Sequence, residues 1–154
     1  MSKWNDKAVQ FVLIWSSISV AINFAFVAAI WFVENVLHVV INKRGADDHG
    51  IWVEFILFCV IAPPVETYFF QKLFYDYFTG NGKSKVWLII LSSIIFGLFH
   101  FYSISYVIVA ALNGVLFIYT YIIWQGHKIS KYLIVTMIHA FHNLFFLLLE
   151  IISS

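Results

Sequence analysis

The sequence predicts an all-α membrane protein, a polytopic transmembrane helical bundle of about five spans. Of the 154 residues, 62% are hydrophobic and only 11% are charged, whereas soluble domains carry about a quarter charged residues. Residues 8–33, 86–127 and 132–149 contain no Asp, Glu, Lys or Arg, and a helix needs about 20 mostly apolar residues to cross a bilayer. We therefore expect a single domain over residues 1–154, embedded in the lipid bilayer.

Charge and cysteine content exclude several other classes of function. The formal net charge is +1, so the chain has no broad basic field for DNA or RNA, and we expect no nucleic-acid partner. Cys59 is the single cysteine, which rules out an internal disulfide and a metal site built from several thiolates. The first apolar run is too long for the core of a signal peptide and is expected to remain as a membrane anchor.

The second apolar run differs from the others because it contains two prolines. Pro63 and Pro64 interrupt it, so we expect two helical pieces, with a proline near the first turn of the second piece. The short polar segments between the runs are too small to fold separately. The predicted spans are 9–32, 51 to about 70, 86 to about 101, 105–124 and 131–149.

The distribution of lysines predicts the orientation of the bundle. With five spans, the N-terminus and the loops around 71–85 and 125–131 lie on one side. That side carries Lys3, Lys7, Lys72, Lys83, Lys85, Lys128 and Lys131. The other side carries only Lys43 and Arg44 as cations, so the N-terminus is predicted to be cytoplasmic. Lysine outnumbers arginine eight to one, a bias typical of AT-rich bacterial genomes, and we expect a bacterial plasma membrane protein.

A few polar side chains fall inside the apolar runs, where they are costly and usually functional. His139 and Asn143 are four residues apart and share one helical face. His100 follows Phe96 by the same spacing, and Glu66 follows the proline break. The full set is Asn23, Glu54, Glu66, Gln71, His100, Asn113, His139, His142 and Asn143.

These side chains are a suitable set for hydrolysis in the membrane. Glu66 can act as a general base that takes a proton from water and returns it to a leaving amine. His100 can hold and polarise that water, and His139 with Asn143 can donate hydrogen bonds to the oxyanion. The candidate catalytic residues are therefore Glu66, His100, His139 and Asn143.

Three segments containing these residues resemble the motifs of a known family. Residues 64–71 (PVETYFFQ), 96–100 (FGLFH) and 139–143 (HAFHN) are similar, in the same order, to the EExxxR, FxxxH and HxxxN motifs of the CPBP intramembrane proteases. This family is also called the Abi or CAAX-protease-like family. The resemblance places the motif-bearing core at about 51–150. It implies a mid-membrane polar cavity in which Glu66 activates water beside His100, with His139 and Asn143 on the oxyanion side.

Two positions depart from the first motif, because Thr67 replaces the second Glu and Gln71 replaces the Arg. The loss of one charge removes the need for the other, so the two changes can compensate. Members are often called metalloproteases, and zinc is the alternative cofactor, with Glu66, His100 and His139 as its ligands. We favour a mechanism without a metal, because Asn143 would be a poor zinc ligand.

The expected partner is a membrane-associated peptide or protein substrate, such as a prenylated protein or a bacteriocin-like leader peptide. The first half of the chain is short for the family, so an oligomer could complete the walls of the cavity. A non-catalytic immunity or peptide-binding protein is the alternative function, supported by Thr67 and Gln71. A third hypothesis, a proton path in a small transporter, needs a polar route to both faces, and the apolar first span argues against it.

Overall fold

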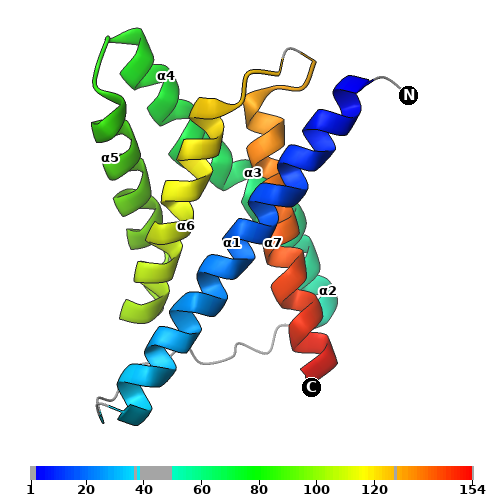
Figure 1. The fold of residues 1–154 in the computed structure, drawn as a ribbon, viewed down its shortest axis with the longest axis vertical. Coiled ribbons are helices and arrows are strands. Elements are labelled where there is room, and N and C mark those ends of the chain that lie inside the picture. The colour runs from blue at the N-terminus through cyan, green and yellow to red at the C-terminus, as the bar shows by residue number, and fades with distance from the viewer. Residues whose placement is uncertain (1–2, 37, 39–49, 127, 154) are drawn as a thin grey trace.

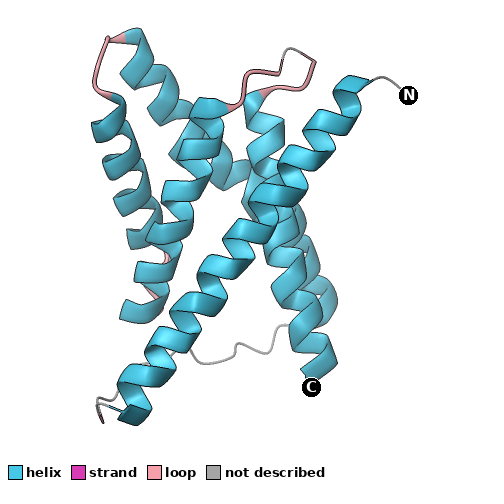
Figure 2. Cartoon of the chain, viewed as in Figure 1, coloured by secondary structure: helices cyan, strands magenta, loops and turns pink. Residues whose placement is uncertain are grey.

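The protein is a bundle of helices in the computed structural model, which describes residues 3–36, 38, 50–126 and 128–153 (Figure 1). Every regular element in these ranges is helical (Figure 2). The prediction of an all-α fold is confirmed. The elements are α1 (Lys3–Val36), α2 (Ile51–Glu54), η1 (Phe55–Ile61), α3 (Ala62–Glu66), η2 (Thr67–Lys72), α4 (Leu73–Gly80), α5 (Lys85–Leu98), α6 (Ile104–Ile123) and α7 (Lys131–Ser153).

Four helical segments are long and apolar enough to cross a membrane: Lys7–Val36, Ile51–Gly80, Ile104–Ile123 and Lys131–Ser153. The chain is an integral membrane protein. The fifth helix, α5, has 14 residues and is about 21 Å long at 1.5 Å per residue, shorter than a hydrocarbon core of about 30 Å. It ends three residues before the predicted end of the third span, so His100 lies in the turn after α5 rather than on the helix.

The interruption predicted at the prolines takes the form of a change in helical hydrogen bonding. Pro63 and Pro64 lie in the first turn of α3, and the helix continues from α2 to α4 through two π-helical segments, η1 and η2. The Ala62 N–H bonds to the Leu57 carbonyl, five residues back. Prolines have no N–H to donate, and the wider π-helical turn accommodates this loss without the chain leaving the helix.

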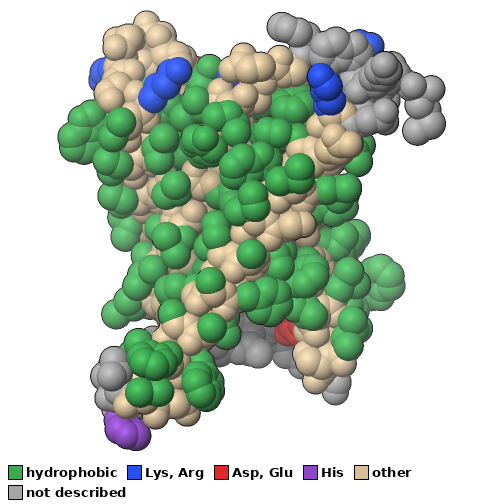
Figure 3. Space-filling model, viewed as in Figure 1, with side chains coloured by type: hydrophobic (Ala, Val, Ile, Leu, Met, Phe, Trp, Pro, Cys, Tyr) green, Lys and Arg blue, Asp and Glu red, His purple; other side chains and the backbone are tan. Residues whose placement is uncertain are grey.

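The lysine-bearing segments gather at one end of the bundle. The N-terminus and the connections from α4 to α5 and from α6 to α7 lie together at the top of Figure 1, and lysine side chains colour the same end in Figure 3. There Lys131 Nζ donates to the Tyr75 hydroxyl at 3.0 Å and Lys83 Nζ to the Tyr77 hydroxyl at 2.8 Å. Lys43 and Arg44, the cations predicted for the other side, lie outside the described residues.

Glycines allow α5 and α6 to pack closely. A Cβ atom on Gly97 would stand 2.7 Å from both the Val107 carbonyl oxygen and Ala111 Cβ, closer than side-chain atoms can approach. Gly114, on α6, lies similarly near the backbone of Ser93. Small residues permit such close helix pairs in membranes, where packing drives association. This contact fixes the end of α5 and, with it, the position of His100.

Candidate active site

His100 is oriented by the backbone of the helix that precedes it. Its Nδ1 lies 2.7 Å from the Phe96 carbonyl oxygen, and a carbonyl only accepts, so Nδ1 is the protonated nitrogen and donates. In the neutral ring Nε2 is then the acceptor. The spacing of four residues also brings the Phe96 and His100 rings together, with their centroids 4.6 Å apart. The contact expected from the FxxxH spacing is thus present.

Glu66 lies between two imidazoles that come from distant parts of the chain. Its Oε2 is 3.8 Å from His100 Nε2 and 3.7 Å from His139 Nε2. These separations are too long for direct hydrogen bonds and are within reach of one bridging water. Within the described part of the chain Oε2 is buried and has no hydrogen-bond partner. The carboxylate therefore has two imidazoles beside it and capacity to accept a proton.

His139 is the most buried member of this group. Its side chain is 5% exposed, and its ring stacks on Phe117 with centroids 4.5 Å apart and an interplanar angle of 28°. The Phe96 ring meets it edge-on at 5.8 Å. Among the described residues its Nδ1 has no hydrogen-bond partner. Packing, rather than hydrogen bonding, holds this imidazole beside Glu66.

Asn143 connects α7 to the π-helical segment. Its Nδ2 donates to the Phe58 carbonyl at 2.7 Å. In π-helical register the donor for this carbonyl would be Pro63, which has no N–H. Asn143 therefore supplies a hydrogen bond that the proline cannot, and one N–H of its amide remains for another acceptor.

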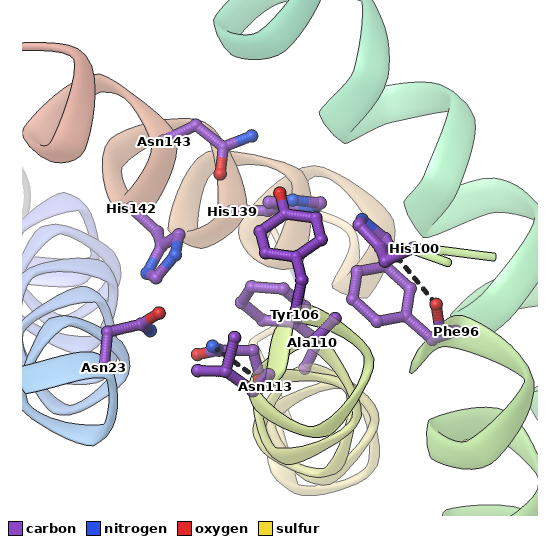
Figure 4. Close-up of a pocket in the computed structure, with 11 residues that line it drawn as sticks. Asn23, Phe96, His100, Tyr106, Ala110, Asn113, His139, His142 and Asn143 are labelled. Atoms are coloured by element: carbon purple, nitrogen blue, oxygen red, sulfur yellow. Dashed lines mark hydrogen bonds between the residues drawn. The ribbon is translucent and has the colours of Figure 1, made fainter. Parts of the chain in front are cut away.

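A small cavity of about 50 Å³ lies beside the imidazoles of His100 and His139 (Figure 4). His100 and His139 line it, and Asn143 lines it as well, so three of the four predicted residues border one space. Glu66 is not part of its wall. The imidazoles thus border both the cavity and the carboxylate.

The sequence did not indicate the role of Ser19 on α1. Its hydroxyl contacts Asn113 Oδ1 on α6 at 2.6 Å and His142 Nδ1 on α7 at 2.8 Å. Asn113 and His142 were recognised as polar side chains in spans, but a serine among several on α1 has no distinguishing pattern. The one usable signal is that Ser19 precedes Asn23 by four residues, on one face of α1, and Asn23 Nδ2 donates to the Ser19 carbonyl at 3.0 Å.

Thr67 and Gln71, which replace the charged residues of the first motif, are both fully buried in η2. Among the described residues Thr67 Oγ1 and both polar atoms of the Gln71 amide have no hydrogen-bond partner. A Glu and an Arg in these positions would need strong pairing to tolerate such burial. Two neutral side chains lower that cost.

The described residues do not contain a group of three or more His, Cys, Asp or Glu side chains arranged to hold a metal ion. Glu66, His100 and His139 would be the donors of such a site, since they are the one carboxylate and the two imidazoles brought together here.

Comparison with known proteins supports the motif assignment. The family model described as type II CAAX prenyl endopeptidase Rce1-like matches residues 48–145. The chain belongs to this family. No curated protein and no solved structure matches the chain significantly. Membership in the Rce1-like family suggests CAAX-type intramembrane protease activity on a membrane protein substrate, and α1 lies outside the matched residues.

Proposed function

We propose that this Rce1-like protein is an intramembrane endopeptidase that hydrolyses a peptide bond with water activated by Glu66. One observation carries the proposal: His100 Nε2 and His139 Nε2, from two separate motifs, both lie within 3.8 Å of Glu66 Oε2. A buried carboxylate beside two imidazoles is a suitable arrangement for general acid–base catalysis.

In the proposed reaction, Glu66 takes one proton from water while the oxygen forms a bond to the scissile carbonyl carbon. His100 positions this water as a hydrogen-bond acceptor, because its Nδ1 proton is already donated to the Phe96 carbonyl. Glu66 then delivers the proton to the amide nitrogen, and the C–N bond breaks. The products are a carboxylic acid and an amine, and Glu66 returns to its starting state.

His139 and Asn143 stabilise the oxyanion in this mechanism. Asn143 has one N–H committed to the Phe58 carbonyl and a second that can reach a ligand. Donors already fixed by packing and backbone contacts are effective because they need little reorganisation when negative charge develops.

The substitution Glu66→Gln tests the proposal. The amide keeps the size of the side chain but is a far weaker base, so we expect cleavage to fall by about 10²–10⁴-fold while the protein still folds. The assay is cleavage of a panel of prenylated CAAX peptides by protein in liposomes. Glu54→Gln is the matched control, because Glu54 is a partly exposed carboxylate on the same continuous helix and should retain activity. Unchanged cleavage by Glu66→Gln would favour a non-catalytic binding protein.

A zinc-dependent mechanism makes a different prediction. If Glu66, His100 and His139 bound zinc, a membrane-permeant chelator would abolish activity and added zinc would restore it. Our metal-free proposal predicts unchanged activity after chelation, with less than one equivalent of zinc in the purified protein by elemental analysis.

We also propose that the lysine-bearing end lies in the cytoplasm of a bacterial cell, following the positive-inside rule. This orientation can be tested in a background without Cys59, the single cysteine. A cysteine introduced at Gly82, in the connection between α4 and α5, should not react with an impermeant thiol reagent in intact cells. It should react once the cells are permeabilised and the reagent reaches the cytoplasmic face.

A further inference from the structure

The cavity beside the two imidazoles also borders α1, the helix outside the family match. Asn23 of α1, Asn113 of α6 and His142 of α7 form its side away from His100 and His139 (Figure 4). Phe117, which is 1% exposed, forms part of its wall. The cavity is therefore a mainly polar, partly open space between α1, α5, α6 and α7.

The hydrogen bonds around Ser19 determine which atoms carry the protons on the α1 side of the cavity. Asn113 Nδ2 donates to the Val109 carbonyl at 3.0 Å, so Asn113 Oδ1 faces Ser19 and accepts the hydroxyl proton at 2.6 Å. A serine has one proton to donate. The 2.8 Å contact with His142 must then run from His142 Nδ1–H to Ser19 Oγ.

This assignment determines which atoms are available to a ligand. With its proton on Nδ1, a neutral His142 has Nε2 as an acceptor. Asn23 uses Nδ2 for the Ser19 carbonyl, so its Oδ1 is an acceptor too. Asn23 and Asn113, which line the cavity, each keep a second Nδ2–H as a donor. The space therefore presents both acceptors and donors, and water can bond to groups of both kinds.

The volume of the cavity favours water, and not a peptide group, as its occupant. A cavity of about 50 Å³ accommodates a few waters, since each needs at least about 10–15 Å³ of such a volume. A peptide unit with its flanking Cα atoms is larger than this space. A buried water also needs two to four polar partners, and the side chains above supply them.

We propose that this cavity holds the water consumed in the reaction, and that Ser19 is a positioning residue that keeps the cavity polar by holding Asn113 and His142. The role in catalysis rests on the proposed function. Water held here would lie against His100 and His139, the two imidazoles that also lie beside Glu66.

A kinetic experiment tests the role of this water. Asn23→Leu keeps the approximate volume and removes the polar atoms, and Ser19→Ala removes the hydroxyl that holds the two neighbours. Each should lower kcat about tenfold, the effect of losing roughly one hydrogen bond, with KM changed less than about twofold. Ser16→Ala is the control, because Ser16 is buried on the same helix and contacts the Ile138 carbonyl at 3.4 Å. A raised KM with unchanged kcat in Asn23→Leu would overturn the proposal, since it would assign the cavity to substrate.

Hydroxyl-radical footprinting tests the presence of water independently of protease activity. Radicals generated from internal water should label Phe117 in the wild-type protein although the side chain is buried. Labelling should fall in Asn23→Leu. Phe70 is the control, a buried phenylalanine (8% exposed) that does not line the cavity. Absence of Phe117 labelling above that of Phe70 would overturn the proposal, even if Glu66→Gln confirms the peptidase. If Phe117 is labelled but the wild-type protein has no peptidase activity, the water site is supported and only the proposed function is rejected.

Discussion

Two groups of buried polar side chains lie near each other at the centre of this bundle, and their geometry differs. In the Ser19 group, formed with Asn113 and His142, contacts of 2.6 and 2.8 Å satisfy the hydroxyl fully. In the Glu66 group, formed with His100 and His139, the separations are 3.7 and 3.8 Å, and the buried carboxylate oxygen has no hydrogen-bond partner within the described residues.

On our proposal, this difference separates a group that holds helices together from a group that carries out the chemistry. Short, saturated hydrogen bonds hold three helices together and leave little capacity to exchange protons. Groups that lie slightly too far apart for a direct hydrogen bond, and that can still accept one, leave room for water and a substrate carbonyl between them. Polar residues in a membrane are costly in both cases, but in the second arrangement the carboxylate oxygen of Glu66 has no hydrogen-bond partner among the described residues.

The largest loss of stability is expected when the charged side chains of the family motif are introduced into η2, next to Glu66. Thr67 is fully buried, so Thr67→Glu places an unpaired carboxylate in the core and should lower the free energy of unfolding by about 3–5 kcal/mol. Adding Gln71→Arg should recover part of this loss, with a coupling energy of about 1–3 kcal/mol. Thermal denaturation of the two single variants and the double variant, followed by tryptophan fluorescence, measures the cycle. Strict additivity would show that the two positions do not compensate.

Histidine substitutions should separate the two groups directly. His100→Gln should lower kcat by about 10²-fold or more with little change in thermal stability. His142→Gln should lower stability by about 1–3 kcal/mol, because it disturbs a satisfied buried network, and kcat by at most about tenfold. Each variant needs both a cleavage assay and a melting curve. If the two variants exchange these phenotypes, the division between a reactive and a structural group is wrong.

A smaller effect is expected from the helix contact that positions His100. Gly97→Ala places a Cβ 2.7 Å from the Val107 carbonyl oxygen, so α5 and α6 must separate, at a cost of about 1–3 kcal/mol. At Gly114 the nearest atoms lie 3.1–3.3 Å away, and the gain in helix propensity of about 1 kcal/mol should offset much of the crowding. Gly97→Ala should therefore impair both melting temperature and cleavage, and Gly114→Ala should nearly preserve both.

Local patterns predicted much of the candidate site. The four-residue spacing of Phe96 and His100 predicted their contact on one helical face, and the rings do touch, although His100 lies in the turn after α5. The proline pair predicted two helical pieces, and the hydrogen bonding does change there through η1 and η2, but the helix stays continuous from α2 to α4. The convergence of Glu66, His100 and His139 was expected from motif order and the family resemblance. The structure places them together, while their catalytic roles remain predictions.

Other features depended on contacts between distant segments. The Ser19 group joins residues 94 and 123 positions apart, and no periodicity in one helix specifies such a meeting. The length of α5 was overestimated because the residues after Leu98 remain apolar, although the helix ends there. The contact between Asn143 and the Phe58 carbonyl spans 85 positions and depends on a carbonyl that the π-helical turn exposes.

By itself, the sequence determined that this chain is an all-α integral membrane protein with a few polar side chains inside its apolar segments, because apolar run length and the cost of buried charge are properties of single segments. The tertiary structure decided which polar groups are saturated and which are available. That distinction depends on distances of a few tenths of an ångström between side chains on different helices, and these are set by packing of the whole bundle.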